Sequence, residues 1–140
     1  MKHFFVLMFF LLLALNALQA QSHPYPYKVV FDLTSKDSLD HKAVLRWIDE
    51  IFKIEPKAEV EVVMYAKGLE MVMPEKSVVT GDAETAMNNP NISFKVCEIA
   101  MKNNKVVKNQ LLPKAQTVPD GIYEIVTKQK EGWVYIKVSH

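Results

Sequence analysis

Cysteine and glycine are both scarce in this chain of 140 residues. The single cysteine, Cys97, excludes a disulfide within the chain, so packing has to stabilise the fold. The four glycines are isolated and form neither a P-loop nor a dinucleotide-binding fingerprint. The serines show no nucleophile-elbow pattern, and His23, His41 and His140 lack the spacing of a metal site. The sequence therefore predicts no bound cofactor and no metal.

An excess of charge of either sign is also lacking. The chain has 17 lysines and arginines against 16 acidic residues, a formal net charge of +1. Such a balance supplies no electrostatic attraction toward nucleic acid or an anionic membrane. We therefore expect neither as a partner.

The first 20 residues have the pattern of an export signal. A basic start containing Lys2 precedes an unbroken apolar run, 4–15, and a short segment ending at Ala20. The run is shorter than the roughly 20 apolar residues of a transmembrane helix. We expect a signal peptide over 1–20, a mature domain over 21–140 without stable membrane insertion, and a periplasmic or secreted location. An uncleaved signal anchor is the alternative, because Leu18 is bulky for a cleavage site.

The rest of the chain is long enough for one domain, and its hydrophobic pattern alternates between strands and helices. The expected strands are 27–33, 60–65, 92–96, 115–118 and 133–138; the expected helices are 38–54, 82–88, 98–103 and 119–130. Residues 69–80 are expected to form loop or short helix, and 106–112 are ambiguous. This alternation predicts an α/β domain, a three-layer flavodoxin-like architecture with a mostly parallel sheet of about five strands.

Three segments carry specific expectations about burial. The strand 27–33 is apolar almost throughout, as in a parallel sheet covered on both faces. On the helix 38–54, the apolar positions recur at helical spacing, and Asp40 is expected on the outer face. Pro119 suits the first turn of the last helix, whose inner side should carry Ile122, Ile125 and Val126.

Cys97 is the candidate functional residue because it ends a predicted strand and precedes a predicted helix. In open parallel sheets, reactive groups gather beyond the carboxyl ends of strands. A thiol there meets backbone N–H groups and the positive end of the helix dipole, which favour the thiolate. Lys67 follows the neighbouring strand and is a candidate partner for that thiolate. The alternative is that Cys97 is a small buried core residue.

The order and spacing of several short segments resemble the DsrE/DsrF-like family across nearly all of 21–140. The matching segments are Tyr27–Asp32, Tyr65–Gly68, Ile92–Cys97, Val118–Glu124 and Gln129–Lys137. The resemblance implies a flavodoxin-like domain that forms homo-oligomers. In the sulfur-relay members of that family, a cysteine at the position of Cys97 carries sulfur as a persulfide.

Three functions follow from these observations. The first is an exported persulfide carrier that uses Cys97 as its one catalytic residue, at most a sulfurtransferase-like activity. Its partners would be a sulfane-sulfur donor and a thiol-bearing acceptor protein. The second is a non-catalytic oligomeric binding or assembly module in which Cys97 is incidental. The third is a redox sensor in which Cys97 forms an interchain disulfide or a sulfenic acid.

Overall fold

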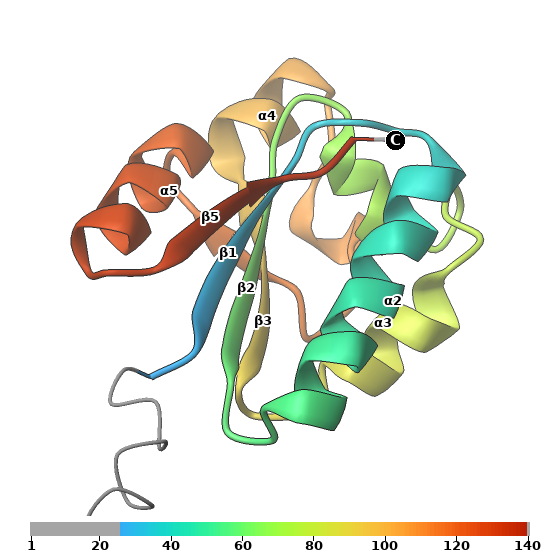
Figure 1. The fold of residues 1–140 in the computed structure, drawn as a ribbon. Coiled ribbons are helices and arrows are strands. Elements are labelled where there is room, and N and C mark those ends of the chain that lie inside the picture. Colours follow the sequence, from blue (N-terminus) through green and yellow to red (C-terminus); the bar gives the residue numbers. More distant parts are fainter. Residues whose placement is uncertain (1–25, 140) are drawn as a thin grey trace, which may run out of the picture.

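The computed structural model describes residues 26–139, which fold as three layers, helices on both sides of one sheet (Figure 1). The strands are β1 (Lys28–Leu33), β2 (Glu59–Met64), β3 (Ile92–Cys97), β4 (Gln116–Val118) and β5 (Val134–Lys137). The helices are α2 (Ser38–Ile54), α3 (Thr80–Ala86), α4 (Glu98–Asn103) and α5 (Gly121–Lys130), with 3₁₀ turns η2 (Gly68–Val72) and η3 (Lys108–Gln110). The predicted signal peptide, 1–20, lies outside the described residues.

The sheet has five strands in the order β4-β3-β2-β1-β5, and every pairing is parallel. The predicted α/β class, three-layer flavodoxin-like architecture and five-stranded sheet are confirmed, although the strand order differs from the 2-1-3-4-5 of flavodoxin itself. β1 lies inside the sheet between β2 and β5. Val30 and Phe31, on opposite faces of β1, are both 0% exposed. The nearly continuous apolar sequence of this strand predicted burial on both faces of the sheet, and that prediction is confirmed.

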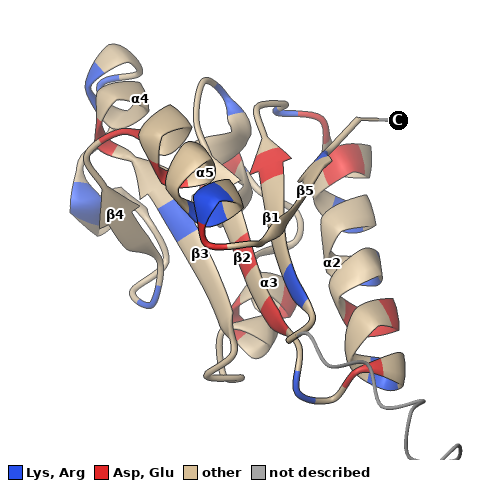
Figure 2. Cartoon of the chain, turned by 60° about the vertical axis from the view of Figure 1, so that its left-hand side comes forward, with Lys and Arg blue, Asp and Glu red and all other residues tan. Residues whose placement is uncertain are grey.

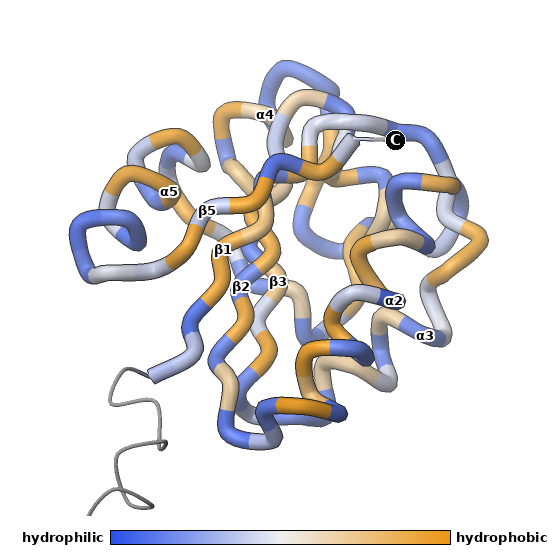
Figure 3. Tube along the Cα trace, in the orientation of Figure 1, coloured by the Kyte–Doolittle hydropathy of each residue, from blue (hydrophilic) through white to orange (hydrophobic). Residues whose placement is uncertain are grey.

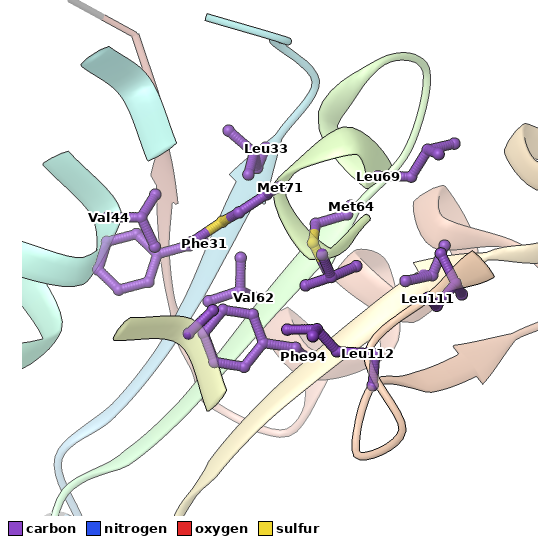
Figure 4. Close-up of a cluster of buried hydrophobic side chains, with 14 of the residues drawn as sticks. Phe31, Leu33, Val44, Val62, Met64, Leu69, Met71, Phe94, Leu111 and Leu112 are labelled. Carbon is purple, nitrogen blue, oxygen red and sulfur yellow. The ribbon is translucent and has the colours of Figure 1, made fainter. Parts of the chain in front are cut away.

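The main core lies between the sheet and α2, α3 and α4. Phe31 of β1 lies beside Val44 of α2 there, Phe94 of β3 lies near Val62 of β2, and Met64 and Met71 belong to the same cluster (Figure 4). Five methionines of the described chain are buried in this core: Met64, Met71, Met73, Met87 and Met101. Gly68 opens η2 where a Cβ would lie 2.0 Å from the Leu33 carbonyl oxygen, so no larger residue fits.

α2 begins and ends where the sequence predicts. Asp37 caps it by accepting a hydrogen bond from the Leu39 N–H, 2.8 Å away. The expectation that Asp40 faces outward is wrong, because Asp40 and His41 are both buried. His41 lies 2.9 Å from the Ser35 carbonyl oxygen through its Nε2. The first turn of α2 is therefore folded against the loop that leads into it.

The opposite face of the sheet carries one helix of the described chain, α5. A small cluster of Val30, Val63 and Ile125 holds α5 there. The predicted burial is correct for Ile125 and wrong for Ile122 and Val126, which are both exposed. A ten-residue helix covering so little apolar surface buries one narrow stripe, and its flanks stay in solvent. Figure 3 shows the resulting mixed hydropathy of α5 beside the strongly apolar central strands.

Pro119 does not start α5. The N-cap is Asp120, whose Oδ1 accepts hydrogen bonds from the Ile122 and Tyr123 N–H groups at 2.8 and 3.4 Å. Asp is a favoured N-cap residue because its carboxylate accepts hydrogen bonds from free N–H groups of the first turn, so α5 begins after Asp120.

Candidate functional site

Cys97 is the last residue of β3 and the N-cap residue of α4, as predicted. The residue is 4% exposed, and its backbone pairs with Val118 of β4. Gly121, the first residue of α5, packs directly on it: a Cβ on Gly121 would lie 3.2 Å from the Cys97 Cβ. Two helices therefore begin beside this thiol.

A pocket of about 390 Å³ lies against Cys97 at the carboxyl end of the sheet. β3 and α4 contribute one wall, the segment after β2 a second, and the start of α5 a third. Its lining residues are Tyr65, Ala66, Cys97, Ile99, Ala100, Asn103, Asn104, Asp120 and Ile122.

The topology explains why a pocket forms at this place. β3 and β4 are neighbours in the sheet, but the helices that follow them lie on opposite faces. α4 joins the main core through Ala100 and Met101, whereas α5 packs on Val30 and Val63. Loops that diverge in this way leave a crevice at the carboxyl ends of the two strands, the usual place for ligands in open α/β sheets.

The polar groups of the pocket are largely engaged in holding its walls. The Asn104 amide donates to the carbonyl oxygens of Ala66 and Ala100 at 2.9 and 2.7 Å. Asp120 is occupied as the α5 cap. The Cys97 side chain makes no capping hydrogen bond to α4, contrary to the expectation that the first turn of α4 points its N–H groups at the sulfur. α4 therefore begins beside the thiol, but no N–H group of its first turn caps the sulfur.

Lys67 does not join this site. Its side chain is exposed and is absent from the pocket lining, while its backbone N–H donates to the Thr34 carbonyl oxygen. Of the three histidines considered as metal ligands, His41 is buried and hydrogen-bonded, and His23 and His140 lie outside the described residues. Within 26–139 no group of three or more histidine, cysteine, aspartate or glutamate side chains is placed to hold a metal.

A second polar cluster, which the sequence reading missed, adjoins the pocket through Tyr65. The buried Asp32 of β1 accepts hydrogen bonds through its Oδ2 from the hydroxyls of Tyr65, at 3.2 Å, and Tyr135, at 2.6 Å. The Lys137 Nζ lies 3.6 Å from the same oxygen, while Oδ1 of Asp32 has no hydrogen-bond partner. Burial, with the Asp32 charge, raises the pKa of Tyr65 to about 12. The hydrogen bond to Asp32, with burial, raises the pKa of Tyr135 to about 12.

A third cluster lies beneath α5. Glu61 of β2 is 2% exposed. Its Oε2 accepts a hydrogen bond from the Ser93 hydroxyl at 3.2 Å and lies 3.6 Å from the Lys128 Nζ. Burial, reinforced by the neighbouring Glu124, raises the pKa of Glu61 to about 7, against the opposing effect of Lys128. In both clusters the sequence signal was an acidic residue inside a predicted strand, Asp32 in β1 and Glu61 in β2.

The fold and this site define a three-layer α/β domain with a pocket at the carboxyl end of a parallel sheet. No known family model and no curated protein matches the chain. A solved structure with a similar fold is that of MTH1491, a protein of unknown function from Methanobacterium thermoautotrophicum, with a TM-score of 0.75 and 24% sequence identity. The match covers 79% of this chain and 98% of that one. At this identity the similarity shows the fold. None of the helices in the described part is long and apolar enough to cross a membrane.

Proposed function

We propose that this protein is an exported DsrE-like persulfide carrier that uses Cys97 as its sulfur-bearing residue. The observation that supports the proposal is the place of Cys97, which borders a pocket of about 390 Å³ where β3 and β4 send their helices to opposite faces. The chemistry of the proposal is based on the resemblance of the segments around Cys97 to the sulfur-relay proteins.

The proposed reaction consists of two thiol exchanges. The Cys97 thiolate attacks the outer sulfur of a sulfane-sulfur donor, a new S–S bond forms, and the S–S bond of the donor breaks. The donor leaves as a thiolate, and Cys97 holds a persulfide. An acceptor thiolate then attacks the terminal sulfur and releases the Cys97 thiolate, so no external oxidant is consumed. The pocket beside Cys97 provides room for the added sulfur.

A second candidate is a non-catalytic binding or assembly module. Two observations favour it: Cys97 is almost fully buried, and neither Lys67 nor the start of α4 engages its thiol. Exposed apolar side chains also lie on α4 and α5, and in this alternative they form the binding surface: Ile99 and Ile122, which line the pocket, and Tyr123 and Val126 further along α5.

Mass spectrometry after treatment with inorganic polysulfide tests the two candidates. A persulfide carrier gains the mass of one sulfur atom on Cys97 while folded, and a reductant removes it. Cys97→Ser gains nothing, because the chain has no other cysteine. The unfolded wild-type chain is the matched control, since its thiol is freely accessible. Sulfur uptake by the unfolded chain alone would favour the binding module.

Export and self-association belong to the same proposal. N-terminal sequencing of protein recovered from the expressing cells should find a chain that starts at Gln21, after cleavage behind Ala20. Recovery of the intact chain in the membrane fraction would instead support the uncleaved anchor.

A further inference from the structure

α5 is attached to the sheet by few apolar contacts. Within 26–139 it is the one helix on its face, and the buried cluster beneath it consists of Val30, Val63 and Ile125, with Tyr65 and Trp133 partly buried against them. The main core on the other face is much larger. Figure 2 shows α5 crossing in front of β2 and β3. Local opening costs least where little apolar surface is exposed by it, and the apolar cluster that opening of α5 would expose is small.

The N-terminal end of α5 covers Cys97. Gly121 is buried against Cys97 and Tyr65, with a built Cβ 3.2 Å from the Cys97 Cβ and 3.4 Å from the Tyr65 Cβ. Asp120 and Ile122, on either side of Gly121, both line the pocket. A small outward movement of this helix would therefore expose the thiol.

Polar contacts hold the C-terminal part of α5 to the sheet. Lys128 lies 3.6 Å from Glu61 of β2, 3.8 Å from Glu124 and 3.7 Å from Glu131, so one ammonium group faces three carboxylates. The Lys128 Nζ also lies 4.8 Å from the centre of the Trp133 ring. Oε1 of Glu61 is buried without a hydrogen-bond partner. Glu61 is therefore the buried carboxylate of this cluster, at 2% exposure, whereas Lys128 and Glu124 are partly exposed. When Glu61 is ionised, its buried charge has one ammonium group to pair with, and that ammonium is shared with two other carboxylates.

The other charged groups on this side of the sheet do not supply the missing cation. Lys95 of β3 acts on Glu61 through its charge, but its ammonium is hydrogen-bonded to Gln116. Lys28 of β1 pairs with Glu59 at 2.9 Å. Lys137 of β5 lies beside Asp32. The charge of Glu61 therefore depends chiefly on Lys128.

We propose that α5 is a pH-responsive cover of the Cys97 pocket, closed while Glu61 is protonated and loosened when Glu61 is ionised beneath it. This inference does not require Cys97 to carry sulfur, because it concerns access to the thiol.

The direction follows from proton linkage. Beneath α5 the pKa of Glu61 is raised to about 7 from its ordinary value of 4.5, so the closed state binds the proton more tightly than an open state in which Glu61 is hydrated. Closure is fully favoured below pH 4.5, weakens as the pH rises, and stays weak above about 7. If Glu61 becomes fully hydrated on opening, the opening equilibrium increases about 30-fold between roughly pH 5.5 and 8.5.

The protection of Cys97 from alkylation tests this proposal. At each pH, the iodoacetamide rate of the unfolded protein is divided by that of the folded protein, which cancels the ionisation of an ordinary thiol. The wild-type protection factor should fall by up to about 30-fold between roughly pH 5.5 and 8.5. Glu61→Gln keeps the shape and an acceptor for Ser93 but cannot ionise, so its protection should stay high and constant. Glu84→Gln, an exposed change on α3, is the matched control and should behave as wild type.

Hydrogen exchange of the α5 amides, corrected for the intrinsic effect of pH, follows the cover without using the thiol. Faster exchange in α5 above pH 7 in wild type, absent in Glu61→Gln, would support the proposal. A protection factor that is constant in wild type, or that falls equally in wild type and Glu61→Gln, would overturn it. Sulfur uptake by Cys97 is measured separately, so failure of the proposed function leaves this result intact.

Discussion

Removal of the Tyr135 hydroxyl tests whether the Asp32 cluster stabilises the carboxyl end of the sheet. The hydroxyl donates at 2.6 Å to a buried carboxylate whose other oxygen has no hydrogen-bond partner. Hydrogen bonds to charged groups contribute about 1.5 to 3 kcal/mol, and the lower end applies here because Tyr135 is partly exposed. We therefore expect Tyr135→Phe to lower the free energy of unfolding by about 1.5 kcal/mol.

The double variant Tyr65→Phe/Tyr135→Phe makes the test sharper. Each hydroxyl compensates for loss of the other, and without both of them Asp32 retains only Lys137, at 3.6 Å. The loss in the double variant should therefore exceed the sum of the single losses. Urea unfolding measures all four proteins, with Tyr123→Phe as the control because that residue is 71% exposed. A Tyr135→Phe variant within about 0.5 kcal/mol of wild type, or strict additivity, would refute the reasoning.

The same cluster has an alkaline consequence. The pKa values of Tyr65 and Tyr135 are raised from 10.0 to about 12 in the folded protein. The stabilising effect is therefore complete below pH 10 and is lost as the pH rises toward about 12. Wild type should lose more stability over this range than the double phenylalanine variant. Equal losses would show that other groups control the alkaline transition.

Three further outcomes are expected. Gly68→Ala should lower the free energy of unfolding by about 3 kcal/mol, because its Cβ would meet the Leu33 carbonyl oxygen at 2.0 Å. Gly81→Ala in α3 has open space around the new methyl group and should be neutral or stabilising by up to about 1 kcal/mol. Thermal unfolding compares the two variants. Gly121→Ala should cost about 1 kcal/mol and increase the alkylation rate of Cys97, since the new methyl group presses α5 away from the thiol; an unchanged rate would contradict that packing. Light scattering at micromolar concentration should find a homo-oligomer, and a monomer would remove that part of the proposal.

The sequence by itself determined the fold class, the place of β1 inside the sheet and the position of Cys97. These features depend on local pattern: a nearly continuous apolar run forms a strand covered on both faces, and the alternating apolar residues of Ile92–Cys97 form a strand that ends at Cys97, before Glu98. The limits of α2 were equally local, because Asp37 caps its start and Pro56 prevents its continuation.

Only the tertiary structure decided what surrounds these residues. Ile122 and Val126 are exposed because the sheet covers a narrow part of α5. Helical periodicity predicts which side chains share a face, but not how much of that face is covered. The surroundings of Asp32 and Glu61 likewise come from distant parts of the chain, since Tyr135 and Lys128 reach them only after β5 and α5 have packed. A strand pattern marks an acidic residue as unusual, but the partner that stabilises its charge, and hence its pKa, exists only once the strands and helices have come together.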